Sequence, residues 1–520
     1  MLHQVLTALA AIERGHHVDA SALQAAIDVQ EALLGRLGRR SLLQRADALH
    51  RLLLLHREAR NIDRACDAGE TLLGVLEQLR EQVADVRYRP NFVGRFRYLH
   101  VQLCEMQLGL GCVTQAFRTI EASKGRMLAD LLEKRCTRMA PLDAGLMESR
   151  ARDLGFIYLT LLTDERKAYF VLVGAGEPQH RVVAFEPIVT RYGELRGGRL
   201  RPTLRALVDT ACKCRWQTSR LSLGRPKVDF LALLAPLVNW LDAALPDKGH
   251  LVICPDGDLY DVPFHLLPFR SARLRDAFRV TGCQGMQSLL AQLDRPPRRP
   301  DAALCLTTLL STEVADERCR AKVEALRSIP EALRACVRTE VPPDVTDAET
   351  LQEFLAPRLL VHLTAHGVSA SESLARDTDL AIDDRALLLL AAGGALPGAE
   401  DAFDSAYPGR LTPRRLAAWP VLDDAHVGLM ACVSGLARES WGGDAVSIVW
   451  ALLQRGVASV LSTYWHVDAQ NGAQFFCAFY QHWLLGKTSR ADAFALAREA
   501  LARRGRPDAA DAFTLSGDWR

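Results

Sequence analysis

The chain has 520 residues, enough for two or three domains, and its 49% hydrophobic and 24% charged residues are ordinary for a soluble globular protein. The formal net charge of +2 excludes a strong bulk attraction to nucleic acid or to an anionic membrane surface. The 13 cysteines are scattered and odd in number, which excludes a secreted disulfide scaffold and favours reduced thiols.

No segment of the sequence has both the length and the hydrophobicity of a membrane-spanning helix. The apolar stretch 230–245 contains polar residues, and the stretch 386–396 is too short to cross a bilayer. The first twelve residues lack the basic start of a signal peptide, so we expect a cytoplasmic protein. No metal site and no cofactor are expected, because the closest cysteine pair, Cys212 and Cys214, has no second pair with which to hold zinc.

Residues 1 to about 137 are expected to be helical throughout, because apolar residues recur three and four positions apart, as they do across residues 42–53. Short polar or glycine-containing breaks fall near residues 15–19, 35–40, 60–62, 88–90 and 109–111. Helices joined by such short breaks favour stacked antiparallel pairs. We therefore predict a TPR-like, partner-binding domain over residues 1–137, with a generic helical bundle as the plainer alternative.

The pattern changes after this region. Residues 156–173 predict two strands joined by a polar turn at 164–167. Further strand-like runs cover residues 250–254, 301–306, 359–364, 427–431 and 459–464. Helical stretches separate most of these runs, and this alternation predicts an α/β fold with a mostly parallel sheet covered by helices on both faces. Such sheets bind ligands at the carboxyl ends of their strands.

Two reactive side chains follow strands of this predicted sheet. His366 ends the run Leu360-Val-His-Leu-Thr-Ala-His-Gly367, and Cys432 ends the run Val427-Gly-Leu-Met-Ala-Cys432. An imidazole beside a thiol can take its proton and activate it as a nucleophile. The backbone N–H groups of Gly367 and Cys432 could then stabilise a tetrahedral oxyanion. The sequence thus predicts a Cys-His catalytic pair.

These segments carry a family resemblance. The region from about 150 to 520 resembles a CHAT domain, a relative of the caspases and separases among the clan CD cysteine peptidases. Segments 250–264, 280–289, 441–446, 452–465 and 475–501 resemble further parts of that domain, and residues 116–132 resemble the helix that links it to TPR repeats. The resemblance implies a caspase-like fold and a cysteine endopeptidase, with His366 as base and Cys432 as nucleophile.

The resemblance also implies an organisation and a setting. The CHAT protease domain would cover residues 138–520, with 138–248 as a pseudo-catalytic or accessory half and 249–520 as the catalytic core. Bacterial CHAT proteases are often defence or cell-death enzymes, activated by an effector complex or cutting a pore-forming gasdermin. The expected partners are therefore a protein substrate, such as a gasdermin or another operon-encoded protein, and an activating protein at the helical domain. Direct contact with membrane or nucleic acid is not expected.

The chain departs from the family pattern near the expected substrate pocket. Where relatives often carry two consecutive acids, this chain has Asp468 followed by Ala469, so a preference for Arg or Lys at P1 is not implied. Asp468 and Asp256 remain candidates for the wall of that pocket. The alternative for both is an ordinary loop carboxylate or helix cap.

Other features have competing interpretations. The long segment between His366 and Cys432 is either a mobile lid or a surface insertion. Glu121 and Lys124, three positions apart in the linking helix, are explained most simply as a surface ion pair. Gly486-Lys-Thr488 lacks the first glycine of a phosphate loop and fits a turn between helices better. The basic run 295–300 fits a solvated linker.

Two other functions compete with a cysteine endopeptidase as the interpretation of this sequence. The first is a catalytically silent scaffold whose caspase-like domain only binds proteins, although such a scaffold has no need of both His366 and Cys432. The second is a hydrolase or acyltransferase of small molecules, which fits poorly with a large helical domain.

Overall fold

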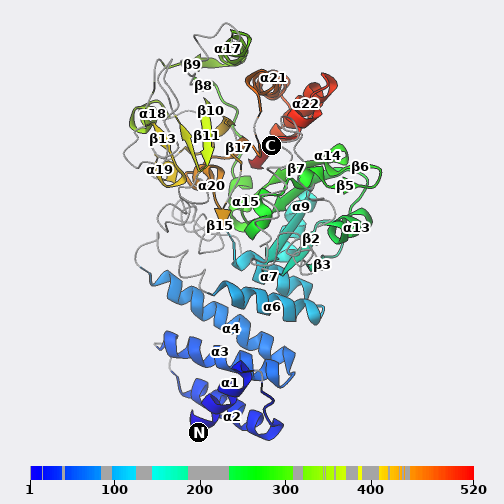
Figure 1. Ribbon diagram of the computed structural model, residues 1–520, viewed down its shortest axis with the longest axis vertical. Coiled ribbons are helices and arrows are strands. Elements are labelled where there is room, and N and C mark those ends of the chain that lie inside the picture. The colour runs from blue at the N-terminus through cyan, green and yellow to red at the C-terminus, as the bar shows by residue number, and fades with distance from the viewer. Residues whose placement is uncertain are drawn as a thin grey trace, which may run out of the picture.

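The computed structural model shows a stack of helices at one end and an α/β body at the other (Figure 1). It describes residues 2–14, 16–37, 41–83, 96–124, 143–164, 166–184, 234–307, 320–342, 345, 347–355, 359–369, 385–388, 409–417, 419, 422–431, 434–435, 438–439, 445–465 and 467–520.

The described part of the N-terminal region consists of helices joined by short connections. Its helices are α1 (Leu2–Glu13), α2 (Ala20–Arg36), α3 (Leu42–Glu58), α4 (Ile62–Glu81), α6 (Arg97–Gly109) and α7 (Val113–Ala122). Each of these helices contacts the next one along the chain, as a TPR-like stack requires. The predicted breaks near residues 15–19, 35–40, 60–62 and 109–111 all fall between these helices. No helix in the described part of the chain is both long and apolar enough to cross a membrane.

One helix joins this stack to the rest of the molecule. Leu103 and Met106 of α6 pack into the apolar core of the N-terminal helices. Cys104 and Leu108, on the opposite side of α6, pack instead into the core beneath the sheet. α6 therefore belongs to two cores at once, which ties the helical stack to the α/β body.

Within the described residues, eleven strands form one mixed sheet. In spatial order these are β3 (Gln179–Ala184), β2 (Lys167–Val173), β1 (Ile157–Thr163), β4 (Gly249–Cys254), β7 (Phe278–Gly282), β18 (Phe513–Gly517), β17 (Ser459–Thr463), β14 (His426–Met430), β10 (Leu360–Thr364), β8 (Ala302–Thr307) and β9 (Arg338–Glu340). The pairs within β1–β4–β7 and within β17–β14–β10–β8–β9 are parallel. β1–β2–β3 and β17–β18 pair antiparallel.

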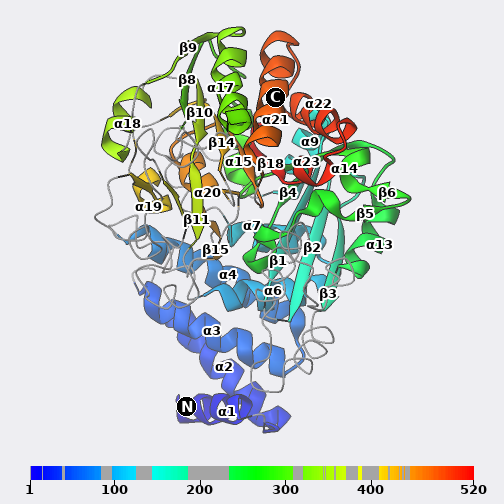
Figure 2. The same cartoon turned by 45° about the horizontal axis from the view of Figure 1, so that its top comes forward.

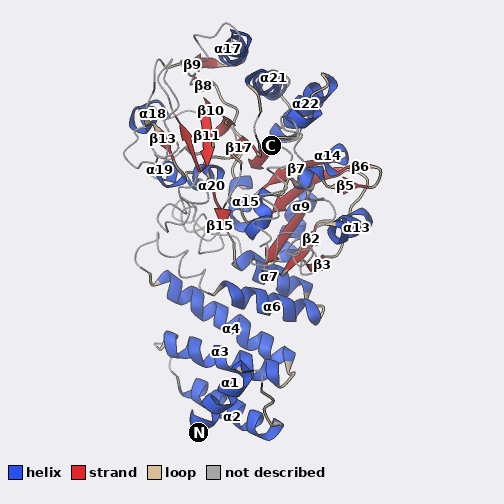
Figure 3. Cartoon of the chain, in the orientation of Figure 1, coloured by secondary structure: helices blue, strands red, loops and turns tan. Residues whose placement is uncertain are grey.

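Helices and short elements surround the sheet (Figure 3). The helices are α9 (Ala144–Leu154), α13 (Ala235–Ala244), α14 (Leu274–Ala277), α15 (Met286–Leu293), α17 (Arg320–Arg334), α18 (Ala348–Leu355), α19 (Pro413–Ala417), α20 (Ile448–Gln454), α21 (Ala469–Tyr480), α22 (Arg490–Arg503) and α23 (Pro507–Ala510), with η2 (Gly257–Asp261), η3 (Phe264–Leu266) and the π-helical η7 (Gln481–Leu485). The small sheets pair β5 (Pro268–Phe269) with β6 (Ala272–Arg273), β11 (His366–Ser369) with β12 (Arg385–Leu388) and β13 (Arg410–Leu411), and β15 (Arg438–Glu439) with β16 (Ala445–Val446).

Both faces of the sheet are buried. Successive residues of a strand point to opposite faces, so one strand shows what covers each face. In β8, Ala303 and Cys305 pack into a core that includes α17 and α21, whereas Leu304 and Leu306 pack into a core that includes α18 and α20. The predicted fold class, a mostly parallel sheet covered by helices and preceded by a helical region, is confirmed. The proposed domain boundaries stay predictions.

Candidate active site

His366 lies immediately beyond the carboxyl end of β10. The five residues of β10 are all buried, and the strand continues through Ala365, whose N–H donates to the carbonyl of Met430 on β14 at 3.2 Å. His366 is half-buried and begins β11, where it lies opposite Leu388 of β12. The histidine therefore sits where the main sheet passes into a small antiparallel sheet.

Cys432 lies outside the described residues, but residues on both sides of it are described. β10 and β14 pair in parallel with Thr364 opposite Met430. Thr364 precedes His366 by two positions, and Met430 precedes Cys432 by two positions. Two strands of a parallel pair end at the same edge of the sheet. The chain therefore leaves β10 and β14 from neighbouring positions.

Thr463, at the end of β17, holds the described residues on either side of position 432. Its hydroxyl donates to the carbonyl of Ala431 at 2.6 Å, and its N–H donates to the hydroxyl of Ser434 at 3.2 Å. Its carbonyl accepts from the N–H of Gly435 at 2.8 Å. Sequence reasoning missed this residue, although the strand-like run 459–464 containing it was predicted.

Gly435 is packed tightly against the same strand. A Cβ added at this position would lie 2.9 Å from the Ser462 hydroxyl and 3.1 Å from the Thr463 carbonyl. A side chain here would therefore push the segment away from β17. Glycine at position 435 is thus needed for close approach to a neighbouring backbone.

The other candidates fall in two different settings. Gly367 is half-buried in β11, opposite Leu387 of β12, and directly follows His366. Asp468 is exposed and caps α21, where its carboxylate accepts from the N–H of Asn471 at 2.9 Å. This position matches the helix-cap alternative.

Asp256 is not placed to contact a substrate side chain, because it is completely buried. Its carboxylate forms an ion pair with the guanidinium of Arg97 from α6 and accepts from the N–H of Thr163 at 2.7 Å. It also accepts from the Thr163 hydroxyl at 3.1 Å. Asp256 thus connects the helical stack to the end of β1, a setting unlike the solvated loop carboxylate or the substrate-pocket wall expected from the sequence.

Glu121 and Lys124 do not form the expected surface ion pair, since both are buried. Glu121 accepts from the Tyr158 hydroxyl at 3.0 Å and from the N–H of Met286, at the start of α15, at 2.7 Å. The Lys124 ammonium donates to the carbonyls of Cys254 at 2.8 Å and Pro255 at 3.2 Å and to the Thr160 hydroxyl at 3.1 Å. The two charges attach the segment after α7 to the sheet.

A histidine also lies within β10 itself. His362 is fully buried, bonded to the Tyr480 hydroxyl at 2.9 Å and the Thr364 hydroxyl at 3.0 Å. Burial lowers the pKa of His362 to about 3, which keeps the ring neutral as a core residue. No group of three or more potential metal-ligating side chains occurs among the residues that the structure describes. The acidic, glycine-bearing segment 391–404 lies outside those residues.

β15 contacts η2, and Figure 2 shows β15 on the side of the α/β body that faces the helical stack.

The comparisons with known proteins can now be set beside this geometry. A family model described as the CHAT domain matches residues 230–518, more than half of the chain. No curated protein sequence matches.

Several solved structures are similar at low identity. Two structures of the Saccharomyces cerevisiae separase–securin complex match at 10% identity with a TM-score of 0.46, covering 88% and 98% of this chain. The matches cover 37% and 42% of those separase-complex chains, so this chain spans about two fifths of their length. The Arg-specific cysteine proteinase gingipain R matches at 13% identity with a TM-score of 0.36, over 60% of this chain and 74% of its own.

Proposed function

Because the chain belongs to the CHAT domain family, we propose that it is a cysteine endopeptidase that cuts a protein substrate through His366 and Cys432. The observation that carries the proposal is the register of two neighbouring strands. Thr364 at the end of β10 lies opposite Met430 at the end of β14, and each precedes one of the two catalytic residues by two positions. A base and a nucleophile that start from adjacent strand ends can meet over one substrate carbonyl.

The proposed reaction uses the pair in two steps. His366 takes the proton of Cys432, and the thiolate attacks the scissile carbonyl to form a tetrahedral oxyanion. The N–H groups of Gly367 and Cys432 donate to that oxyanion. His366 then gives the proton to the leaving amine, and the resulting thioester is hydrolysed by a water molecule that His366 deprotonates.

We further propose that the helical region over residues 1–137 binds an activating protein and that the protease domain covers residues 138–520. Support comes from the contacts between the two parts, since α6 packs into both cores and Arg97 of α6 pairs with the buried Asp256. A partner that moves α6 would disturb the sheet directly. A role in bacterial defence or cell death, with a gasdermin or another neighbouring gene product as substrate, belongs to this proposal.

The test is proteolysis of the products of neighbouring genes, with candidate activators present, read by intact mass. Wild-type protein is compared with Cys432→Ala and His366→Ala, and with Cys336→Ala as a matched control at a half-buried cysteine of the α/β body. A cut made by wild type and Cys336→Ala only is the expected result. A cut that persists in Cys432→Ala contradicts the assignment, and no cut by any form favours the scaffold function.

A further inference from the structure

A cavity of about 580 Å³ lies away from the candidate active site, and none of its lining residues belongs to that site. Two segments that are far apart in the sequence meet on it, the basic linker at Pro297–Arg299 and the turn at Lys487–Ser489. The guanidinium of Arg299 donates to the carbonyl of Lys487 at 2.8 Å and ties the two segments together. The sequence alone indicated a solvated linker and a turn between helices, and only the fold brings these two segments together.

Positive charge dominates the lining. The basic lining residues are Arg279, Arg298, Arg299, Lys487 and Arg520, and the acidic one is Asp492. Asp492 forms an ion pair with Arg279, so its charge is already compensated. His250, also on the lining, adds no positive charge at neutral pH, because burial lowers its pKa to about 3.

Two of these cations have no carboxylate partner within the described residues, namely Arg299 and Lys487. The bond from Arg299 to the Lys487 carbonyl holds the linker against the turn, and both side chains are exposed. Arg299 and Lys487 therefore leave two uncompensated positive charges on the lining of the cavity. Lys487 also adopts a φ of 54°, a left-handed conformation that is uncommon for a residue with a side chain. The backbone of this turn is therefore held in a specific shape.

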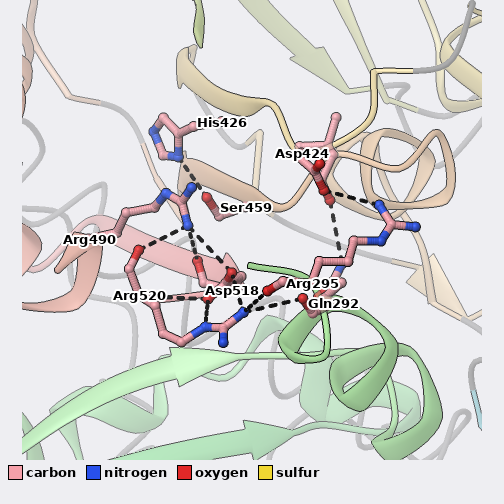
Figure 4. Close-up of polar contacts among 9 residues, drawn as sticks. Gln292, Arg295, Asp424, His426, Ser459, Arg490, Asp518 and Arg520 are labelled. Atoms are coloured by element: carbon pink, nitrogen blue, oxygen red, sulfur yellow. Dashed lines mark hydrogen bonds and ion pairs between the residues drawn. The ribbon is translucent and has the colours of Figure 1, made fainter. Parts of the chain in front are cut away.

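Arg520, which lines the cavity, is held in place by a network of polar contacts (Figure 4). The guanidinium of Arg520 is held by the carboxylate of Asp518 at 3.0 Å and by the carbonyl of Arg295 at 2.8 Å. Arg490, which is buried, donates to the carbonyl of Arg520 at 3.0 Å, and its guanidinium lies 5.0 Å from the centre of the Trp483 ring. Asp518 compensates the charge of Arg520, as Asp492 does for Arg279, and these bonds fix the position of the Arg520 guanidinium on the lining.

The amino terminus of α22 opens on the same cavity. Ser489 caps this 14-residue helix by accepting from the N–H of Asp492 at 3.0 Å, and both residues line the cavity. The first turn of a helix carries a partial positive charge and favours bound anions. Arginine adds a planar fork of N–H donors that matches phosphate oxygens.

We propose that this cavity binds a small phosphate-bearing anion, such as a nucleotide or a free polyphosphate. Its volume lies in the range of small-molecule sites, which run from about 300 to 1,000 Å³. A cavity lined by one sign of charge concentrates counter-ions of the opposite sign. The turn at Gly486-Lys-Thr488 is not a phosphate loop of the strand–loop–helix type, because η7 precedes it and no strand does. It contributes Lys487 and Thr488 to a site built from several elements.

The test is isothermal titration calorimetry of the full chain with two probes, inorganic tripolyphosphate and ATP. The cavity variant is Arg299→Gln with Lys487→Asn, since asparagine tolerates the left-handed conformation better than most residues. The control is Arg503→Gln with Arg504→Asn, which removes the same charge from exposed positions at the far end of α22. The unfolding midpoint of each variant without ligand establishes that it is folded.

We expect wild-type protein and the control to bind at least one probe with a micromolar Kd, and the cavity variant to bind at least about tenfold more weakly, equivalent to about 1.4 kcal/mol. Equal affinity for both probes identifies the phosphate chain as the recognised group, and tighter binding of ATP identifies a nucleotide. The proposal is overturned if wild type binds neither probe at about 1 mM, or if the control loses as much affinity as the cavity variant. Because the readout is binding and not proteolysis, the outcome is independent of the proposed peptidase activity.

Discussion

The hydroxyl of Thr463 donates to the carbonyl of Ala431 at 2.6 Å, across the gap between β17 and the residue before Cys432. The same threonine bonds Ser434 and Gly435 through its backbone. The end of one strand therefore holds the segment that carries the proposed nucleophile from both sides. This makes Thr463 a positioning residue of the proposed site.

Replacing Thr463 by valine keeps its shape and removes only the hydroxyl. The Ala431 carbonyl would lose its partner, at a cost of about 1–3 kcal/mol in the free energy of unfolding. We expect kcat for proteolysis to fall at least about tenfold with little change in KM, because a misplaced nucleophile affects the chemical step.

Two variants control this result. Thr463→Ser keeps the hydroxyl and should restore most of kcat. Thr281→Val removes an equivalent buried hydroxyl that bonds His250 at 2.8 Å, far from the proposed site, and should change stability but not kcat. Equal loss of kcat in Thr281→Val and Thr463→Val would show that the effect is general destabilisation.

Gly435→Ala tests the close approach at the other end of the segment. The new Cβ would lie 2.9 Å from the Ser462 hydroxyl and 3.1 Å from the Thr463 carbonyl, so the backbone must shift. We expect loss of proteolytic activity in a protein that still folds.

The matched control is Gly74→Ala within α4, where an added Cβ meets no atom within 4 Å. That change should raise the free energy of unfolding by roughly 0.5–1 kcal/mol and leave activity unchanged. Full activity in Gly435→Ala would show that proteolysis does not require the close approach of Gly435 to β17.

Breaking the ion pair between Arg97 and the buried Asp256 should strongly destabilise the protein. Removing one partner leaves an uncompensated buried charge, which typically costs about 3–5 kcal/mol. We therefore expect Asp256→Ala and Arg97→Met each to lower the free energy of unfolding strongly in urea denaturation, and the double variant to lose less than their sum.

A conservative change at Asp256 tests whether this residue acts only within the fold or also recognises the substrate. If Asp256 acts only within the fold, Asp256→Asn will cut the same bond as wild type, with the same preference at P1. A changed P1 preference in Asp256→Asn would restore this residue to the substrate pocket.

Three buried histidines should make stability depend on pH. Burial lowers the pKa of His250 and of His362 to about 3 and lowers that of His426 well below its ordinary value. Between the unfolded value of about 6.5 and the folded value, the unfolded chain binds a proton that the folded chain does not. The stabilisation is therefore present above about pH 6.5 and is lost as the pH falls toward 3, at up to about 1.4 kcal/mol per pH unit for each histidine.

His362→Gln measures one of these contributions. We expect its free energy of unfolding to fall less steeply than that of wild type between about pH 6.5 and pH 4.5, by up to about 1.4 kcal/mol per pH unit. An unchanged slope in His362→Gln would mean that this ring does not titrate on unfolding.

The strands that position the site were predictable because they are short, continuous apolar runs. The run at 359–364 became β10 and the run at 427–431 became β14, with a one-residue difference at the start of β10 and at both ends of β14. β18 was missed, since Phe513–Gly517 is a five-residue segment that alternates apolar with polar residues and carries little signal of its own. Its place between β7 and β17 depends on pairing with distant strands.

Side chains that act between domains were harder to predict. Glu121 and Lys124 have the spacing of a surface pair on a helix, and only the docking of the segment against β1, β4 and α15 buries them. Asp256 looked like a loop carboxylate for the same reason, since its partner Arg97 is 159 positions away in the chain. Such long-range contacts leave no local pattern in the sequence.

The most direct test of the central proposal measures the alkylation rate of every cysteine by iodoacetamide at about pH 6, where an ordinary thiol with a pKa near 8.5 reacts slowly. Burial raises the pKa of the Cys66 thiol to about 11 and also raises those of Cys336 and Cys477, so these thiols should be slow. With peptide mass spectrometry as the readout, we expect Cys432 to react at least about tenfold faster than the others in wild type and at an ordinary rate in His366→Ala. A Cys432 that reacts no faster than the other thiols, and equally fast with and without His366, would contradict the Cys-His pair.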